Sequence, residues 1–333
     1  MDVVSDAISA VRIGRPSSQR VRVAGSWCTR LAPYEGAGFH VVLEGRCRLL
    51  PDGGDPVELG PGDAVLLPHG TGHVIADGSA DAARLARAVP FERWQDGTGS
   101  RPAPPVAPGD GTAVEMLCGK YRLDRSHVHP LLAELPPVVH LPHRGDGADS
   151  GLRSAIDLLG REVGERLPGS GVALPSLLDL LLVYMVRSWT FANVSAGAPA
   201  GASVGAPAGA SGGPVGTWPA ALGDPVTAAA LRALHADPAA PWTNDLLAAE
   251  AGVSRPTLAR RFTSLVGRPP MAYLTWWRLT RGAALLRDTR DPLASVARRV
   301  GYSTPYAFSH AFRREFGTTP GLYRTALGAA IAD

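Results

Sequence analysis

Arginine and other polar side chains recur along two short segments near the end of this chain. One segment carries Arg255, Arg260 and Arg261, and the other carries Arg313 and Arg314. Apolar residues lie between them at the three- and four-residue spacing of an amphipathic helix, so the polar side chains share one exposed face. A guanidinium group can bind phosphate oxygens or the edge of a guanine through paired hydrogen bonds. Both faces could therefore contact a nucleic acid.

These two segments belong to one pattern that the chain contains twice. A small residue, a glycine turn, a serine and a following amphipathic helix form the sequence signature of a helix-turn-helix unit. Two such units predict a protein that reads two successive stretches of DNA. The first copy runs Ala248-x-x-x-Gly252-x-Ser254-x-x-x-Leu258-x-x-x-Phe262, then Gly267-x-x-Pro270-x-x-Tyr273, and the second runs Ala297-x-x-x-Gly301-x-Ser303-x-x-x-x-Phe308-x-x-x-Phe312, then Gly317-x-x-Pro320-x-x-Tyr323.

A linking helix is predicted between the two copies, from Met271 to about Asp288, where Gly282 is the one glycine and there is no proline. Its length would be about 27 Å at 1.5 Å per residue. Successive major-groove faces of DNA lie roughly 34 Å apart. One rigid helix could therefore hold both recognition helices on the same side of a duplex.

The repeat resembles the DNA-binding domain of the AraC/XylS family over nearly all of residues 224–326. The motifs that carry the resemblance are Gly252-Val253-Ser254-Arg255, Arg260-Arg261-Phe262 and Gly267-x-Pro269-Pro270 in the first copy, and Val300-Gly301-Tyr302-Ser303, Ala311-Phe312-Arg313-Arg314 and Pro320-x-x-Tyr323-Arg324 in the second. The resemblance implies double-stranded DNA as a partner, together with RNA polymerase.

Base contacts are implied by the same resemblance at Pro256, Ala259 and Arg260 in the first unit. Direct readout there is expected to rest on Arg260, because a proline and an alanine side chain offer no hydrogen bond to a base. His310 stands where the family often has an arginine. The full set expected to face DNA is Ser254, Arg255, Pro256, Thr257, Arg260, Arg261, Thr304, Tyr306, Ser309, His310, Arg313 and Arg314.

Charge is divided unevenly along the 333 residues, although the net charge is only +3. Residues 220–333 hold 14 Arg against 8 acidic residues, whereas residues 1–219 are acidic on balance. A basic half beside a non-basic half is typical of a protein in which one domain contacts phosphate groups. The N-terminus lacks a basic, then apolar, export signal, and the apolar run Leu177–Val186 is too short to span a membrane. We therefore expect a cytoplasmic protein without a membrane partner.

The first half of the chain predicts a β-sandwich or barrel, because short apolar segments alternate with Gly, Pro and Asp turns. Expected strands are Val21–Val23, Phe39–Leu43, Cys47–Leu50, Val57–Leu59, Ala64–Leu67, His73–Ala76 and Ala113–Leu117. A helical pattern follows from Leu152 to Phe191, and residues 195–216 consist almost entirely of Gly, Ala, Ser, Pro and Val. The predicted domains are a sensor at 1–150, a helical dimerisation segment at 151–194, a flexible linker at 195–223 and the reader at 224–326.

The sensor half resembles the cupin-type sensor of a subgroup of AraC-like regulators. Its motifs are Gly38-Phe39-His40-Val41-Val42-Leu43-Glu44-Gly45, Gly62-Asp63 and Leu67-Pro68-His69-Gly70-x-x-His73. A metal ion would need three or four ligands. His40 and His73 could supply two, with Glu44 or His69 as a third, or the two histidines could be hydrogen-bonded barrel residues. Val42 replaces the second histidine of the first cupin motif, which favours the second reading and no cofactor.

Three cysteines, Cys28, Cys47 and Cys118, have no metal-type spacing. They could be buried core residues, or they could form a redox switch that answers an oxidant. The effector is accordingly an unidentified small molecule or oxidant.

The sequence as a whole predicts an α+β protein of two domains, a cupin-like β-barrel with a helical segment followed by an all-α double helix-turn-helix. We interpret it as a homodimeric, sequence-specific transcription factor and not as an enzyme. The alternatives are a cupin dioxygenase, which the lost histidine disfavours, and an architectural DNA-binding protein, which would bind without sequence preference.

Overall fold

The structure is a computed structural model, and it describes residues 2–91, 113–124, 128–143, 150–165, 167–195 and 218–332. The chain divides into two compact units. The first unit comprises residues 1–14, 124–134 and 190–333, and the second comprises residues 15–123 and 135–189.

The second unit is a sandwich of two five-stranded sheets. One sheet has the order β1 (Arg12–Val23), β9 (Val114–Leu123), β3 (Ala37–Glu44), β6 (Ala64–Leu67) and β10 (Val139–Leu141). The other has the order β5 (Val57–Leu59), β4 (Cys47–Pro51), β7 (His73–Ala76), β2 (Cys28–Leu31) and β8 (Val89–Pro90), with the short helix α2 (Ala82–Ala86) between β7 and β8. The sequence prediction gave β5, β6 and β7 with the observed bounds, because each is a short apolar run closed by Gly or Pro.

Side chains from both sheets meet in the interior of the sandwich. The buried core includes Val42 and Val65 from one sheet and Leu49, Leu59 and Ile75 from the other. Successive residues of a strand point to opposite faces, so every second residue of β3 and β9 leaves this core and faces outward.

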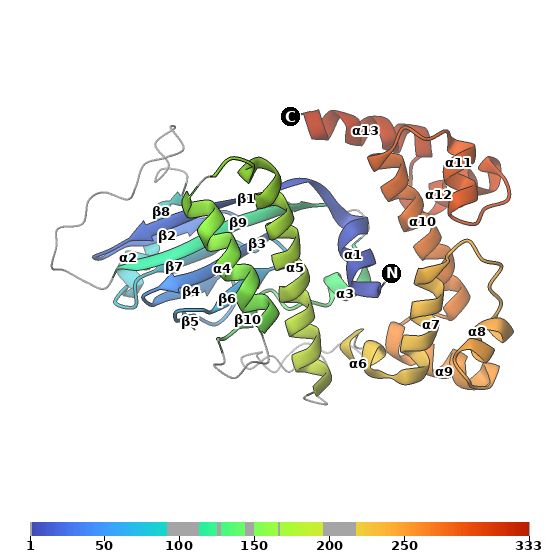
Figure 1. The fold of residues 1–333 in the computed structure, drawn as a ribbon, viewed down its shortest axis with the longest axis horizontal. Coiled ribbons are helices and arrows are strands. Elements are labelled where there is room, and N and C mark those ends of the chain that lie inside the picture. The colour runs from blue at the N-terminus through green and yellow to red at the C-terminus, as the bar shows by residue number, and fades with distance from the viewer. Residues whose placement is uncertain are drawn as a thin grey trace. The chain divides into compact units, whose positions relative to one another are not determined.

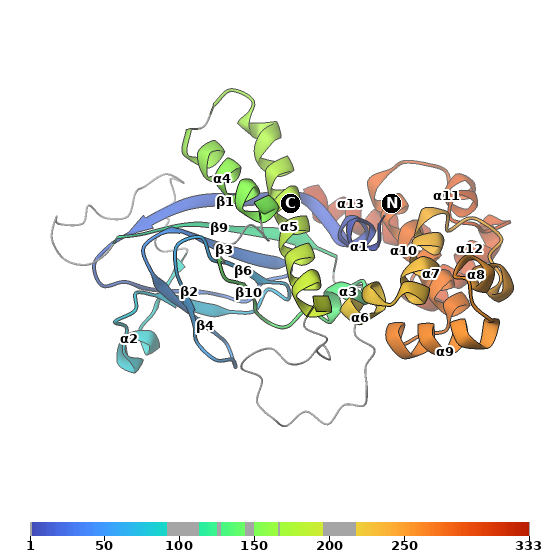
Figure 2. The same ribbon diagram turned by 60° about the horizontal axis from the view of Figure 1, so that its bottom comes forward.

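Two helices cover the outer face of the first sheet, α4 (Ser150–Glu165) and α5 (Ser170–Ser195) (Figures 1 and 2). The Tyr121 hydroxyl on β9 donates to the Leu178 carbonyl on α5 at 2.7 Å, and Arg20 on β1 donates to the Gly160 carbonyl on α4 at 3.3 Å. α5 contains one stretch, Ser170–Asn193, whose length and composition alone would suffice to cross a membrane, yet only 28% of its most apolar window is buried within the structure. One face of the helix, with Leu181, Met185 and Val186, is buried, whereas Val172, Leu180 and Phe191 remain exposed in a single chain.

Helices dominate the first unit. Its elements are α1 (Val3–Val11), α3 (Pro130–Ala133), α6 (Trp218–Gly223), α7 (Pro225–Ala236), α8 (Asn244–Glu250), α9 (Arg255–Val266), α10 (Pro270–Asp288), α11 (Leu293–Arg299), α12 (Pro305–Phe316) and α13 (Pro320–Ala332). α10 runs between the pair α8–α9 and the pair α11–α12 (Figure 1). The predicted linking helix is thus confirmed and begins one residue earlier, at a proline that a helix tolerates in its first turn.

Three segments of the first unit differ from the sequence expectation. The expected sensor domain, 1–150, includes α1 and residues 124–134, yet both pack in the helical unit. α1 begins where the Asp2 carboxylate accepts a hydrogen bond from the Ser5 amide, a short cap without a long amphipathic pattern behind it. Residues 196–217 of the expected linker lie outside the described residues, and Trp218–Gly223 at its end forms α6, with Trp218 fully buried.

We expect Gly282→Ala to destabilise the second helix-turn-helix unit, although alanine favours a helix by about 1 kcal/mol. A Cβ at position 282 would lie 2.7 Å from the Phe308 ring, and Phe308 is itself fully buried. Overpacking of this kind costs about 1–3 kcal/mol. Urea unfolding should show a lowered free energy of unfolding, with Gly321→Ala, where an added Cβ meets no atom within 4 Å, as the control. An unchanged or raised free energy for Gly282→Ala would show that Phe308 can move aside.

Candidate functional site

The first helix-turn-helix unit consists of α8, a tight turn and α9. The Thr243 side chain caps α8 by accepting a hydrogen bond from the Leu246 amide at 3.2 Å. Gly252 adopts φ = 67° in the turn, a conformation that favours glycine. α9 then begins with Arg255 and Pro256, and its buried face carries Leu258 and Phe262.

The repeated serine at the start of the second helix of each helix-turn-helix unit does not cap that helix with its side chain. Ser254 occupies the N-cap position of α9, but its hydroxyl bonds the Thr257 hydroxyl at 2.9 Å and no backbone amide. In the second helix-turn-helix unit the cap of α12 is Thr304, the residue after Ser303. Its side chain accepts a hydrogen bond from the Ala307 amide at 3.1 Å. Capping by hydroxyl groups needs a side chain aimed at the first turn, and the sequence alone does not give that angle.

Two arginines that the sequence reasoning did not assign hold the turns to the long helix. Arg278 on α10 donates to the carbonyl oxygens of Pro238 and Ala240 at 2.6 and 2.8 Å, just before α8. Arg324 on α13 donates to the Leu286 carbonyl near the end of α10 at 3.2 Å and to the Asp291 carbonyl just before α11 at 2.7 Å. Arg324 directly follows the repeated Tyr323, whereas Arg278 comes five residues after Tyr273, so the repeat gave no signal for this shared role.

The expected DNA-facing residues form two exposed faces. On α9 and its cap, Ser254, Arg255, Pro256, Arg260 and Arg261 are exposed and Thr257 is half-buried. On α12, Thr304, Tyr306, His310, Arg313 and Arg314 are exposed, Tyr306 by 82%, and Ser309 is half-buried.

The arginines of α9 differ in their partners. Arg261 lies 3.3 Å from a carboxylate oxygen of Asp224, and Arg255 lies 3.9 Å from one of Asp245. Arg260 makes no ion pair or side-chain hydrogen bond within the part of the chain that the structure describes. Its fork of donors is therefore the one that is open to an added ligand.

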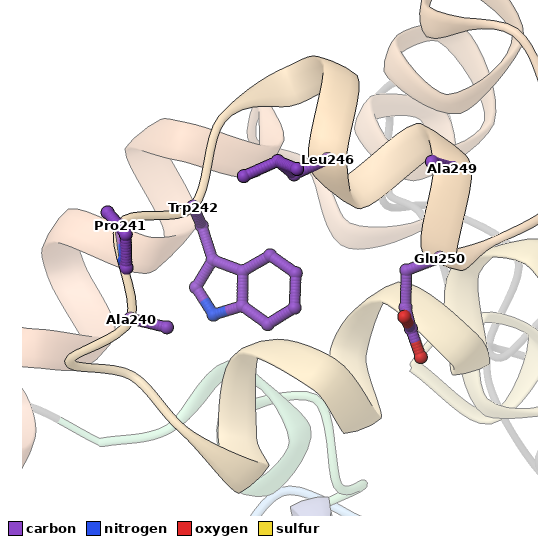
Figure 3. A pocket seen from close by; sticks show the side chains of 6 residues that line it. All are labelled: Ala240, Pro241, Trp242, Leu246, Ala249 and Glu250. Atoms are coloured by element: carbon purple, nitrogen blue, oxygen red, sulfur yellow. The ribbon is translucent and has the colours of Figure 1, made fainter.

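One concave surface in this unit lies beside the first helix-turn-helix, away from these two faces (Figure 3). The Trp242 ring forms its floor, and Leu246, Ala249 and Glu250 of α8 line one side. The Trp242 indole N–H donates to the Asp237 carbonyl at 2.8 Å, which fixes the ring. The groove carries none of the residues expected to contact DNA.

Inside the sandwich the structure joins His40, His73 and Cys118. His40 on β3 and His73 on β7 come from opposite sheets, and their Nε2 atoms lie 2.8 Å apart. The Nδ1 atom of His40 lies 3.1 Å from the Cys118 sulfur, and that of His73 lies 2.9 Å from the Thr71 carbonyl. Burial lowers the pKa of both histidines, so both rings are neutral at pH 7.

Because both rings are neutral, every hydrogen bond in this row of three side chains has one direction. Because the Thr71 carbonyl can only accept, His73 carries its proton on Nδ1 and accepts on Nε2. His40 therefore donates from Nε2 and accepts on Nδ1, so the Cys118 thiol donates to it. The three side chains satisfy one another.

The candidate metal ligands do not assemble into a metal site. Glu44 lies exposed at the end of β3, and His69 Nε2 lies 2.7 Å from the Leu135 carbonyl. No group of three His, Cys, Asp or Glu side chains with metal-binding geometry occurs in the described ranges. Two histidines that bond each other, with a protonated thiol behind them, do not fit a cupin metal.

All three cysteines are free thiols. Burial raises the pKa of Cys28, raises that of Cys47 to about 12 and raises that of Cys118 further. A redox-active cysteine has a lowered pKa, because the thiolate is the reactive form. The surroundings of these thiols therefore give none of the activation that a redox switch requires.

Comparison with known proteins finds two family models along the chain. A cupin family model matches residues 2–190, and a helix-turn-helix domain model matches residues 247–326. An AraC-like transcription regulator of Streptomyces lividans is 33% identical over 97% of this chain and 98% of its own length. The transcriptional regulator AlkR of Acinetobacter baylyi is 26% identical over 97% of this chain and 99% of its own. The DNA-binding domain of AdpA, solved in complex with a target DNA, is 34% identical over 32% of this chain and 96% of that domain, with a TM-score of 0.31.

We expect iodoacetamide at pH 8 to alkylate Cys47 and Cys118 only after unfolding. With a pKa of about 12, Cys47 would be thiolate in about one molecule in 10⁴ at that pH. Mass spectrometry of native and urea-unfolded protein checks this, with half-buried Cys28 as the internal reference. Rapid native labelling of Cys118 would contradict the hydrogen-bond direction assigned to His40.

Proposed function

Since this chain belongs to the AraC family of transcriptional regulators, with an N-terminal cupin domain and a C-terminal helix-turn-helix domain, we propose that α9 and α12 enter successive major grooves of one DNA site. The observation that carries the proposal is the pair of exposed polar faces on two helices that a single helix joins. α10 has 19 residues, which gives a length of about 28 Å at 1.5 Å per residue. Successive grooves lie roughly 34 Å apart.

Within the first face, Arg260 reads a guanine edge, and Arg255 and Arg261 bind phosphate groups. Arg261 and Arg255 each have a carboxylate neighbour. A phosphate group could replace that carboxylate or share the guanidinium with it. A guanidinium without a protein partner can place both donors on the O6 and N7 atoms of guanine.

The second face combines Tyr306, Ser309 and His310 with two phosphate-binding arginines, Arg313 and Arg314. The Ser309 hydroxyl donates to the Pro305 carbonyl at 2.8 Å, so toward DNA it can only accept a hydrogen bond. His310 offers one donor or one acceptor where an arginine would offer a fork. This face therefore contributes less base discrimination than the first.

The segment 151–194 serves as the dimerisation element. Exposed apolar side chains follow α4 and α5, including Leu158 (43% exposed), Val172 (77%), Leu180 (39%) and Phe191 (62%). A patch of this kind on a long apolar helix is typical of a protein–protein interface. The further partners in this proposal are RNA polymerase and a small-molecule effector, and the location is the cytoplasm, where the protein reaches DNA. Residues 196–217 connect α5 to α6 and serve as the linker between sensor and reader.

We expect Arg260→Ala to lower affinity for the selected site by about 1–3 kcal/mol and to relax the preference at one base pair. Arg261→Ala is the matched control, and it should weaken binding to all sequences alike and reduce the salt slope by about 1. Sites selected from random duplexes and then titrated at several salt concentrations give both quantities. An equal loss on every sequence for Arg260→Ala would make Arg260 a phosphate contact.

Substitution of Leu180 by Asp should convert the full-length dimer to a monomer, because the carboxylate would be buried between two apolar helices. Leu322→Asp is the control, since Leu322 is 64% exposed on α13, outside the proposed interface. Sedimentation equilibrium measures the mass of each variant. A wild-type protein that stays monomeric at high concentration, or a Leu180→Asp dimer, would exclude this interface.

A further inference from the structure

Four polar side chains meet inside the helical unit, and two of them come from outside the reader. Asp6 lies on α1, and His129 precedes α3; His235 lies on α7 and Tyr273 on α10. His129, His235 and Tyr273 have no exposed surface, and Asp6 is 4% exposed. Neither the repeat nor the cupin motifs account for this cluster.

The four side chains form one continuous chain of contacts. His129 Nε2 lies 3.2 Å from the Tyr273 hydroxyl, which lies 2.7 Å from His235 Nε2. His235 Nδ1 lies 2.9 Å from one carboxylate oxygen of Asp6, and Arg281 lies 3.4 Å from the other.

Each hydrogen bond among these four side chains has one possible direction. The Asp6 carboxylate accepts, so His235 is protonated on Nδ1 and accepts on Nε2 from the Tyr273 hydroxyl. His129 Nδ1 accepts from the Leu131 amide at 3.2 Å, so its Nε2 carries the proton and donates to the tyrosine oxygen. Both histidines are therefore neutral when the chain is complete.

Aromatic rings seal the cluster. The His129 ring lies 4.9 Å from that of Trp218 and 5.3 Å from that of Trp276, and the His235 ring stacks on Trp277 at 4.3 Å. Water is thereby kept from the hydrogen bonds, and a lost partner could not be replaced by solvent.

Further contacts hold the same two segments to the reader. Arg287 on α10 donates to the Ala10 and Ser9 carbonyls at the end of α1, at 3.0 and 3.3 Å. The Tyr323 hydroxyl donates to the Asp124 carboxylate at 2.7 Å, and the Trp218 amide donates to that of Glu134 at 2.9 Å. Residues 2–11, Asp124 and residues 128–134 are therefore docked on α10, α13 and α6.

The docked segments continue directly into the sandwich. α1 ends at Val11 and β1 begins at Arg12, whereas β9 ends at Leu123 and Asp124 follows. The Asp124 amide donates to the Val11 carbonyl at 2.6 Å, so the two chain ends are joined where they enter the helical unit. β1 and β9 are also neighbours in their sheet.

We propose that the His129–Tyr273–His235–Asp6 chain is a proton-sensitive clamp, which holds residues 2–11 and 128–134 on the reader at neutral pH and releases them in acid. A proton on His129 would set two donors, Nδ1–H and the Leu131 amide, against each other. A proton added to His235 would make its Nε2 a donor, so the Tyr273 hydroxyl could no longer donate to it. The only other neighbour of that hydroxyl in the cluster, His129 Nε2–H, is also a donor. Either event leaves a buried donor without an acceptor.

Among the residues that the structure describes, no carboxylate forms a hydrogen bond or ion pair with His129. The charged and titratable groups that face the two histidines are Asp2 and Asp6 from α1, Glu134 beside α3, and Tyr273, Arg268 and Arg281 from α10. Asp6 is already paired with both His235 and Arg281, and Glu134 accepts from the Trp218 amide.

The direction of the pH effect follows from burial, which lowers the pKa of His129 and of His235 in the docked state. An undocked histidine titrates near its ordinary pKa of about 6.5. Docking is therefore independent of pH above about 7 and weakens by up to about tenfold per pH unit for each histidine below about 6.5.

Hydrogen exchange of the full-length protein, followed by mass spectrometry, measures clamp opening without DNA and so independently of which side chains read bases. Protection factors are compared at pH 7.5 and 5.5, each relative to the intrinsic exchange rate at that pH. We expect peptides 3–11 and 129–134 to lose about tenfold to a hundredfold in protection at pH 5.5, with α12 almost unchanged.

Two variants separate the clamp from other titrations. His129→Gln/His235→Gln should remove the pH dependence of both peptides, whereas His40→Gln/His73→Gln, which alters the buried histidines of the sandwich, should leave it intact. Tyr273→Phe should lower protection at pH 7.5. Tyr302→Phe should not, because Tyr302 is a half-buried tyrosine of the second helix-turn-helix unit, outside the cluster. Equal wild-type protection at the two pH values, an equal loss in α12, or a loss that persists in His129→Gln/His235→Gln would overturn the proposal.

Discussion

The packing of both helix-turn-helix units on α10 is the constraint on which the reader depends. Tyr273 at one end of α10 packs its ring against Phe262 of α9 at 5.7 Å, and Gly282 near the other end admits the Phe308 ring of α12. Each fully buried aromatic or aliphatic side chain contributes about 1.5–3 kcal/mol. Because both recognition helices are fixed to one rigid body, their polar faces keep a constant spacing, and a constant spacing is what a periodic duplex can match.

The buried polar chain acts on the same helix, since Tyr273 belongs both to the aromatic contact with α9 and to the clamp. A buried donor or acceptor that loses its partner costs about 1–3 kcal/mol, so the four groups are either all satisfied or released together. The two docked segments of the proposed clamp thus connect the sandwich to the reader, in addition to the chain between α5 and α6. A two-state contact of this kind can be biased by an effector that binds one state better.

Much of this could be predicted from the sequence, because the signals are local. The strands β5–β7, the helix α10 and the buried faces of α9 and α12 follow from apolar spacing and from Gly and Pro positions. The clamp could not be predicted, because Asp6, His129 and His235 are far apart in sequence and carry no spacing signal. Trp218 was placed in a linker because its neighbours are small residues, and the candidate metal ligand Glu44 was placed near His40 by sequence distance alone, whereas it lies exposed at the end of its strand.

Hydroxyl-radical footprinting of a selected DNA site tests the central claim most directly, namely that α10 presents two recognition helices to successive grooves. For each protomer the account predicts two protected patches, one helical turn or about 10 base pairs apart on the same face of the duplex. Arg260→Ala should weaken the patch under α9, and Arg314→Ala the patch under α12. A single protected patch per protomer, or two patches that weaken together in both variants, would contradict it.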